Sequence, residues 1–200
     1  MLSSVRRQTL VWSSFAVLSI ATAIPVEAQT EKVDERRVEE ILHHAETRAS
    51  SESNASFDYG DFPRAVQLQK FRYELRPWDG GLATDLIWML GNVGDDGTAL
   101  SYAIRYRRES VDDPDHSLPL AQLYWNWRMF SRIPELLEDD IKKDWPMHRN
   151  VFVILSNAYA RMGYHKDVVR VLDVALKHFP GDEVFIRNRE RSLARIDGRA

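Results

Sequence analysis

Large apolar residues recur at helical spacing through most of the chain, and glycine or proline interrupts each run. The segment 150–162 places them three or four positions apart, on one helical face: Phe152, Leu155, Tyr159 and Met162. The segment 165–179 repeats the arrangement with Val168, Val171, Leu172, Ala175 and Phe179. Gly163 permits the left-handed turn that ends a helix, and Pro180 cannot continue one. The pattern therefore predicts two antiparallel helices joined by a short turn.

A similar helical spacing of apolar residues upstream predicts two more helix pairs, 82–93 with 99–110 and 118–130 with 134–145. One such pair has too little core to be stable alone, so we expect the pairs to stack. The recurrence of Pro77, Pro114, Pro146 and Pro180 at intervals of 37, 32 and 34 residues indicates a helical repeat. The Arg- and Glu-rich run 183–196 predicts a polar capping helix at the end of the stack.

The region before residue 57 is more polar. Residues 32–49 predict one amphipathic helix, and the small polar run SSESNAS at 50–56 predicts a flexible linker. We therefore divide the chain after residue 28 into an N-terminal helix with its linker (29–56) and a repeat domain (57–200). The segment 59–77 predicts the turn and second helix of a further pair, whose first helix is either 32–49 or the stretch just before Phe57.

The C-terminal pair resembles the tetratricopeptide repeat (TPR) family, most clearly over residues 149–182. The residues that carry the resemblance are Phe152, Leu155-Ser156, Tyr159, Val168, Leu172, Ala175 and Pro180. The resemblance is degenerate upstream, where the small and aromatic positions of the family are only partly filled. It implies an all-α fold, a TPR-like α-solenoid of about three to four antiparallel helix pairs with the polar C-terminal capping helix.

The first 28 residues are predicted to be a secretory signal peptide. Arg6 and Arg7 precede the apolar stretch 10–26, and Val26-Glu27-Ala28 places small residues at the cleavage site, so we expect cleavage after Ala28. The alternative is an uncleaved membrane anchor, which Pro25 and the serines of the stretch disfavour. The expected location is therefore the periplasm or outside the cell.

Charge and composition exclude several classes of function. The formal net charge of −3 gives no cationic excess for nucleic acid, and the absence of cysteine excludes disulfides and thiolate metal sites. His43 and His44 are adjacent and point apart on a helix, and we interpret the histidines as solvated surface residues. Glu138, Asp139 and Asp140 are interpreted as a solvated face. No catalytic constellation stands out, so we expect neither an enzyme nor a cofactor.

Tyr124, Trp125, Trp127 and Phe130 form an aromatic cluster on one predicted helix, with Trp125 directed away from the others. The resemblance implies that the first helix of each pair lines a concave groove. Carried over to this sequence, the groove positions are Gln122, Trp125 and Asn126 in one pair and Val153, Asn157 and Arg161 in the next, joined by Leu118 and Ala160. The amides would bind a peptide backbone, Arg161 a carboxylate and Trp125 an apolar side chain. The alternative is that Trp125 only packs between repeats.

The sequence thus predicts a non-catalytic exported scaffold or adaptor that binds a protein or peptide in its groove. The alternative is a helical accessory module of an envelope enzyme complex in cell-wall or polysaccharide metabolism. Neither reading identifies the partner. Contact with a membrane is expected only through an uncleaved signal segment.

Overall fold

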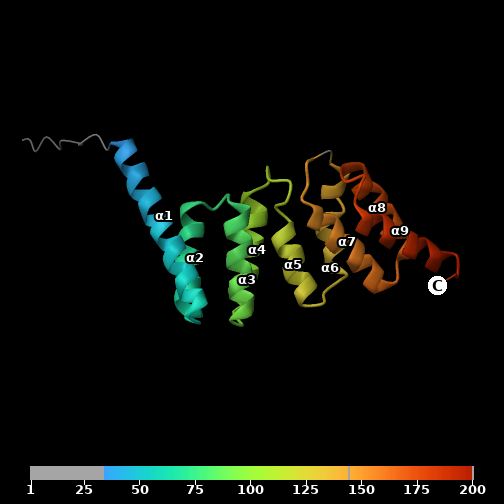
Figure 1. Cartoon of the computed structure of the whole chain (residues 1–200), viewed down its shortest axis with the longest axis horizontal. Helices are drawn as coiled ribbons and strands as arrows, with labels where there is room; N and C mark the ends of the chain where they lie inside the picture. The colour runs from blue at the N-terminus through green and yellow to red at the C-terminus, as the bar shows by residue number, and fades with distance from the viewer. Residues whose placement is uncertain (1–33, 144, 200) are drawn as a thin grey trace, which may run out of the picture. The chain divides into compact units, whose positions relative to one another are not determined.

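The computed structural model describes residues 34–143 and 145–199, and every regular element in these ranges is a helix (Figure 1). The predicted signal peptide and its cleavage site at Ala28 lie outside the described residues. The α-helices are α1 (Glu35–Asp58), α2 (Phe62–Leu75), α3 (Gly80–Asn92), α4 (Asp96–Glu109), α5 (Leu118–Asn126), α6 (Arg132–Leu137), α7 (Arg149–Met162), α8 (His165–His178) and α9 (Glu183–Ile196). A short 3-10 helix, η1 (Asp140–Lys142), follows α6. Within the described ranges, no helix is both long enough and apolar enough to cross a membrane.

Consecutive helices pack against one another as antiparallel pairs: α1 with α2, α3 with α4, α5 with α6 and α7 with α8. The first helices of the last three pairs also meet, because α5 contacts both α3 and α7. The last helix, α9, packs on α8 and completes the stack. Residues 35–199 therefore form a TPR-like helical solenoid, and the predicted fold class is confirmed.

The turns within the pairs share one backbone conformation. Gly60, Gly94 and Gly163 each follow the first helix of a pair in the left-handed region, with φ of 79°, 78° and 82°. Glycine adopts this conformation without the steric cost that a Cβ brings. In the third pair, Arg128 occupies the corresponding position with φ of 57°.

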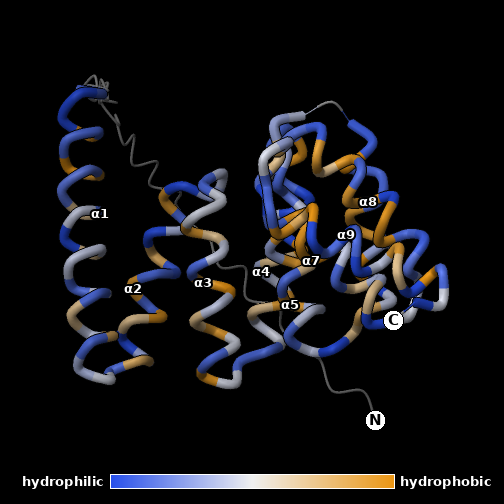
Figure 2. Tube along the Cα trace, turned by 45° about the vertical axis from the view of Figure 1, so that its right-hand side comes forward, coloured by the Kyte–Doolittle hydropathy of each residue, from blue (hydrophilic) through white to orange (hydrophobic). Residues whose placement is uncertain are grey.

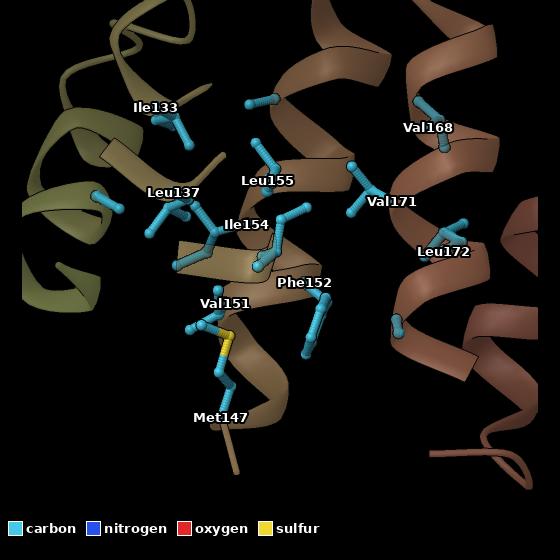
Figure 3. Packing of buried hydrophobic residues seen from close by; sticks show 14 of the residues in the cluster. Ile133, Leu137, Met147, Val151, Phe152, Ile154, Leu155, Val168, Val171 and Leu172 are labelled. Carbon is cyan, nitrogen blue, oxygen red and sulfur yellow. The ribbon is translucent and has the colours of Figure 1, made fainter. Parts of the chain in front are cut away.

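Two clusters of buried side chains form the core. The first cluster spans α2 to α5 and includes Tyr73, Leu86 and Tyr106. The second spans α5 to α9, where α7 lies between α6 and α8 and buries Phe152 and Leu155 (Figure 3). In Figure 2 the apolar parts of α7 and α8 contrast with the hydrophilic beginning of α1. Tyr124 and Leu136, from α5 and α6, pack against both clusters.

The predicted linker at 50–56 is wrong, because α1 continues through it to Asp58 and pairs directly with α2. The small side chains of Ala49, Ser53 and Ser56 are buried there. They lie three or four positions apart, so they face α2 together and let the two helices approach closely. The Ser53 hydroxyl donates a hydrogen bond of 3.2 Å to the carbonyl of Ala65 on α2. Small polar residues, which elsewhere indicate a loop, here form a helix–helix contact.

The third pair is shorter than predicted. Helix α5 ends at Asn126, so Trp127 and Phe130 lie beyond it rather than on one helix with Tyr124 and Trp125. Helix α6 covers only Arg132–Leu137 instead of 134–145. The left-handed residue Arg128 reverses the chain there, which the sequence pattern did not reveal.

Of the acidic run 138–140, which we predicted to be a solvated face, only Asp139 is exposed. Asp140 is buried, and its carboxylate accepts a hydrogen bond of 3.1 Å from Lys143. The side chain of Glu138 joins two helices, because it accepts hydrogen bonds of 2.7 Å from Tyr159 on α7 and 2.6 Å from Arg170 on α8. His116 is also buried, contrary to the prediction of surface histidines, with its Nδ1 atom 2.7 Å from the carbonyl of Asp113.

Candidate functional site: a groove on the first helices

The first helices of three successive pairs, α3, α5 and α7, line a cavity of about 690 Å³. We call this cavity the central groove. Its wall combines indole rings with side-chain amides, contributed by Trp88, Trp125, Trp127, Asn92, Gln122, Asn126 and Asn150. Val153 and Ile154 of α7 complete the apolar part of the wall. The arrangement follows from the stacking, because the first helix of each pair lies beside the first helix of the next.

A second cavity of about 350 Å³ extends the groove toward the beginnings of the same helices. We call it the acidic end. It shares Asp85 and Gln122 with the central groove and adds the carboxylates of Asp113 and Asp115. Asp113 accepts a hydrogen bond from the Tyr106 hydroxyl, and Asp115 accepts one of 2.8 Å from the backbone N–H of His148. These bonds connect the loop before α5 to α4 and α7, so the acidic end has a fixed geometry.

A third cavity of about 390 Å³ lies at the other end, where α5 and α7 finish. Its lining residues are Trp125, Asn126, Arg128, Phe130 and Arg161, and we call it the arginine pocket. Trp125 and Asn126 belong to both the central groove and this pocket, so the two cavities adjoin. The rings of Trp125 and Phe130 lie 5.1 Å apart between centroids and form an apolar wall.

The three cavities differ in charge. Among the described residues, neither the central groove nor the acidic end has a lysine or arginine in its lining. Burial raises the pKa of the Asp85 carboxyl, an effect that the charge of Arg72 opposes and the carboxylate of Asp79 reinforces. Burial likewise raises the pKa of Asp115. Asp96, at the edge of the central groove, accepts a hydrogen bond of 3.2 Å from the indole N–H of Trp127. The charge thus changes from negative to positive along the groove.

The structure brings together six of the eight predicted groove residues. Leu118 lines the acidic end, and Ala160 is not among the described residues that line the three cavities. Gln122, Trp125, Asn126 and Val153 line the central groove, and Arg161 lines the arginine pocket with Trp125 and Asn126. Asn157 is half-buried on α7 between Val153 and Arg161, and it is not among the described residues that line these cavities. Trp125 packs beside Phe130 and also lines two cavities. Its contact with an apolar side chain of a ligand stays a prediction.

The sequence analysis missed the residues contributed by α3 and by the α5–α6 turn. Asp85, Trp88 and Asn92 of α3 form one wall of the central groove, and Arg128 belongs to the arginine pocket. The residues of α3 could have been found from the sequence, by aligning 82–93 with the first helices of the two later pairs. Arg128 could not be found in this way, because its position depends on a left-handed backbone where the other turns have glycine.

The lining of the groove contains side chains of the kinds that bind peptides. Side-chain amides pair with the N–H and C=O groups of an extended backbone, and indole rings cover apolar or cationic side chains. Among the described residues, no group of three or more histidine or acidic side chains is placed to hold a metal ion.

Comparison with known proteins shows the fold. No family model matches the chain, and no curated protein matches its sequence. Solved structures of MamA do match: one has a TM-score of 0.58 at 13% identity, covering 78% of this chain and 85% of that one. A second MamA structure, of AMB-1, has a TM-score of 0.55 at 19% identity, covering 80% of this chain and 85% of that one. A third, of MSR-1, has a TM-score of 0.53 at 16% identity, covering 77% and 88%. These likenesses place the chain with TPR-like helical solenoids by fold.

Proposed function

We propose that the protein is a non-catalytic scaffold or adaptor that binds an extended segment of a partner protein in the groove formed by α3, α5 and α7. The observation that carries the proposal is the continuity of the three cavities. The central groove shares Asp85 and Gln122 with the acidic end, and it shares Trp125 and Asn126 with the arginine pocket. A continuous groove across three helices fits a chain better than it fits a compact small molecule.

The lining supports a peptide as the occupant. An extended chain offers an N–H or C=O group at every residue, and four amides lie along the groove wall, from Asn92, Gln122, Asn126 and Asn150. Trp88 is 52% exposed, so its indole ring offers a large apolar surface that the fold leaves partly uncovered. Aromatic side chains of this kind dominate the binding energy of many protein interfaces.

The experiment is site-specific photocrosslinking in cells. A photoreactive amino acid at Gln122 should crosslink a protein partner through the central groove. The same amino acid at Trp78, which is 69% exposed and lies outside the three cavities, serves as the position control. The proposal is wrong if the two positions give the same crosslinked species.

A matched pair of tryptophan variants tests the energetics. Trp88→Ala should weaken binding of the crosslinked partner by about tenfold or more, since aromatic anchors commonly contribute this much. Trp78→Ala removes an equally large exposed side chain outside the groove and should leave the affinity unchanged. Circular dichroism of both variants must show unchanged helix content for the comparison to hold.

We also propose that the protein acts after export, with residues 1–28 removed. The support is the sequence pattern of the signal segment, in which a basic beginning precedes an apolar stretch and small residues precede the expected cleavage site.

A further inference from the structure

The arginine pocket contains two cationic side chains without an internal partner. Within the described part of the chain, neither Arg128 nor Arg161 makes a hydrogen bond or an ion pair through its guanidinium group. Some other arginines are paired, because Arg105 lies 2.7 Å from Glu74 and Arg170 lies 2.6 Å from Glu138. No carboxylate lines the pocket among the described residues. Two exposed arginines without an internal partner thus line one cavity.

Arg128 holds its place at a conformational cost. Its φ of 57° is the left-handed conformation that glycine provides in the other three turns. A left-handed conformation is unfavourable for a residue with a Cβ, and such outliers cluster at binding sites. The turn itself would form more readily with glycine, so the arginine is better explained by its side chain than by its backbone.

The chemistry of the pocket matches one kind of group. A guanidinium group binds a carboxylate with two parallel hydrogen bonds, and an amide such as that of Asn126 adds a further donor. The wall formed by Trp125 and Phe130 covers the aliphatic part of a side chain and lowers the competition from water. A cavity of about 390 Å³ accommodates one side chain of this kind.

The central groove and the acidic end repel a carboxylate. Their charged lining residues are the acidic side chains of Asp85, Asp96, Asp113 and Asp115. An acidic residue of a bound segment therefore has a single favourable position along the groove, beside Arg128 and Arg161.

We propose that the arginine pocket binds the carboxylate of an aspartate or glutamate side chain in the partner's segment, and thereby fixes the direction in which that segment lies in the groove. The proposal rests on the proposed function and adds the charge and polarity of the ligand. The occupant is a segment with one acidic residue toward the ends of α5 and α7, and with neutral or basic residues toward the acidic end.

The probe is a displayed library of random twelve-residue peptides, selected on the protein and then counter-selected on the Trp88→Ala variant. Peptides that bind the protein and not the variant are groove ligands. We expect most of these groove ligands to contain an aspartate or glutamate, at a fixed number of residues from a neutral or basic half of the peptide. Enriched groove ligands without an acidic residue would overturn the inference and leave the proposed function standing. If no peptide distinguishes the protein from Trp88→Ala, both fail.

A double-mutant cycle on one selected peptide assigns the contact. Arg161→Gln should lower the affinity about tenfold, and replacing the peptide's Glu by Gln should do the same. Combining the two changes should cost little more than either alone, because both remove one interaction. Additive losses would show that the acidic residue binds elsewhere.

Two further variants separate binding from folding. Arg187→Gln, on the exposed part of α9, removes the same charge outside the pocket and should leave the affinity unchanged. Arg128→Gly should lower the affinity for the acidic peptide while it raises the melting temperature. If Arg128→Gly raises the melting temperature and leaves the affinity intact, Arg128 has no part in the pocket and the inference is overturned.

Discussion

Arg128 and Gly163 occupy the same backbone position in successive helix pairs. Each follows the first helix of its pair in the left-handed conformation, with φ of 57° and 82°. The next residue in each turn donates a hydrogen bond to a carbonyl five residues earlier, from Met129 to Tyr124 over 2.8 Å and from Tyr164 to Tyr159 over 2.9 Å. The two turns are therefore alike in geometry although one has arginine where the other has glycine.

Exchanging these residues should change the free energy of unfolding in opposite directions. Arg128→Gly should stabilise the protein by about 0.5–1 kcal/mol, because the relief of left-handed strain exceeds the entropy that glycine adds to the unfolded chain. Gly163→Arg should destabilise it by about 1 kcal/mol, through the backbone alone, since a Cβ at this position meets nothing within 4 Å. Urea unfolding of both variants measures the two changes. If both substitutions changed the free energy of unfolding in the same direction, the two turns would not be equivalent.

The contact of α1 with α2 predicts how substitutions in the segment 50–56 change the stability of the protein. Ser53 is 1% exposed and faces α2, whereas Ser51 on the same helix is exposed. Ser53→Leu should lower the free energy of unfolding by about 1–3 kcal/mol, because the larger side chain forces the two helices apart. Ser51→Leu adds the same side chain to the surface and should change it by less than about 0.5 kcal/mol. Similar effects of the two substitutions would indicate that the segment is a loop after all.

Asp182 should make the stability of the C-terminal helices depend on pH. The hydrogen bond from Arg149 holds the pKa of Asp182 below its usual range, an effect that burial opposes and that backbone N–H groups of α9 reinforce. A lowered folded-state pKa means that the stabilisation is complete above the unfolded-state value, about 4, and is lost as the pH falls through the folded-state value. The difference in unfolding free energy between the protein and Asp182→Asn should therefore be present at neutral pH and vanish in strong acid.

Arg149→Gln provides the control for this pH dependence. Arg149 donates to both carboxylate oxygens of Asp182, one of these bonds being 3.2 Å long. Without the guanidinium group the main cause of the lowered pKa is gone, so the acid-dependent difference should shrink. A difference that persists unchanged in the Arg149→Gln background would assign it to another group.

The proposed export has a direct chemical test. N-terminal sequencing of the exported protein should give Gln29 as the first residue, because cleavage is expected after Ala28. A membrane-bound product that begins at Met1 would instead support the uncleaved anchor.

Much of the fold could be predicted because each helix pair shows its pattern locally. The apolar spacing of 150–162 and 165–179, with Gly163 between them, matches α7 and α8 closely. The pattern failed where small residues pack. The run 50–56 indicates a loop by composition, and only the presence of α2 makes Ser53 and Ser56 part of a buried helix face. Propensity is a weak guide when a tertiary contact decides the structure.

The site was harder to predict than the fold. Positions on α5 and α7, such as Trp125 and Val153, follow from the register of a repeat that the sequence shows. The wall formed by Asp85 and Trp88 depends on where α3 lies relative to α5, which is a contact between distant segments. Arg128 depends on a single backbone angle. Neither kind of information is present in the spacing of apolar residues.

The division of the core has a mechanical consequence. The two buried clusters meet at the third pair, where Tyr124 and Leu136 belong to the border of both. Any bending of the stack at this border changes the separation of α3 and α7, which are the opposite walls of the groove. A bound segment that contacted both walls would oppose this bending, so we expect occupancy of the groove to make the helix stack more rigid.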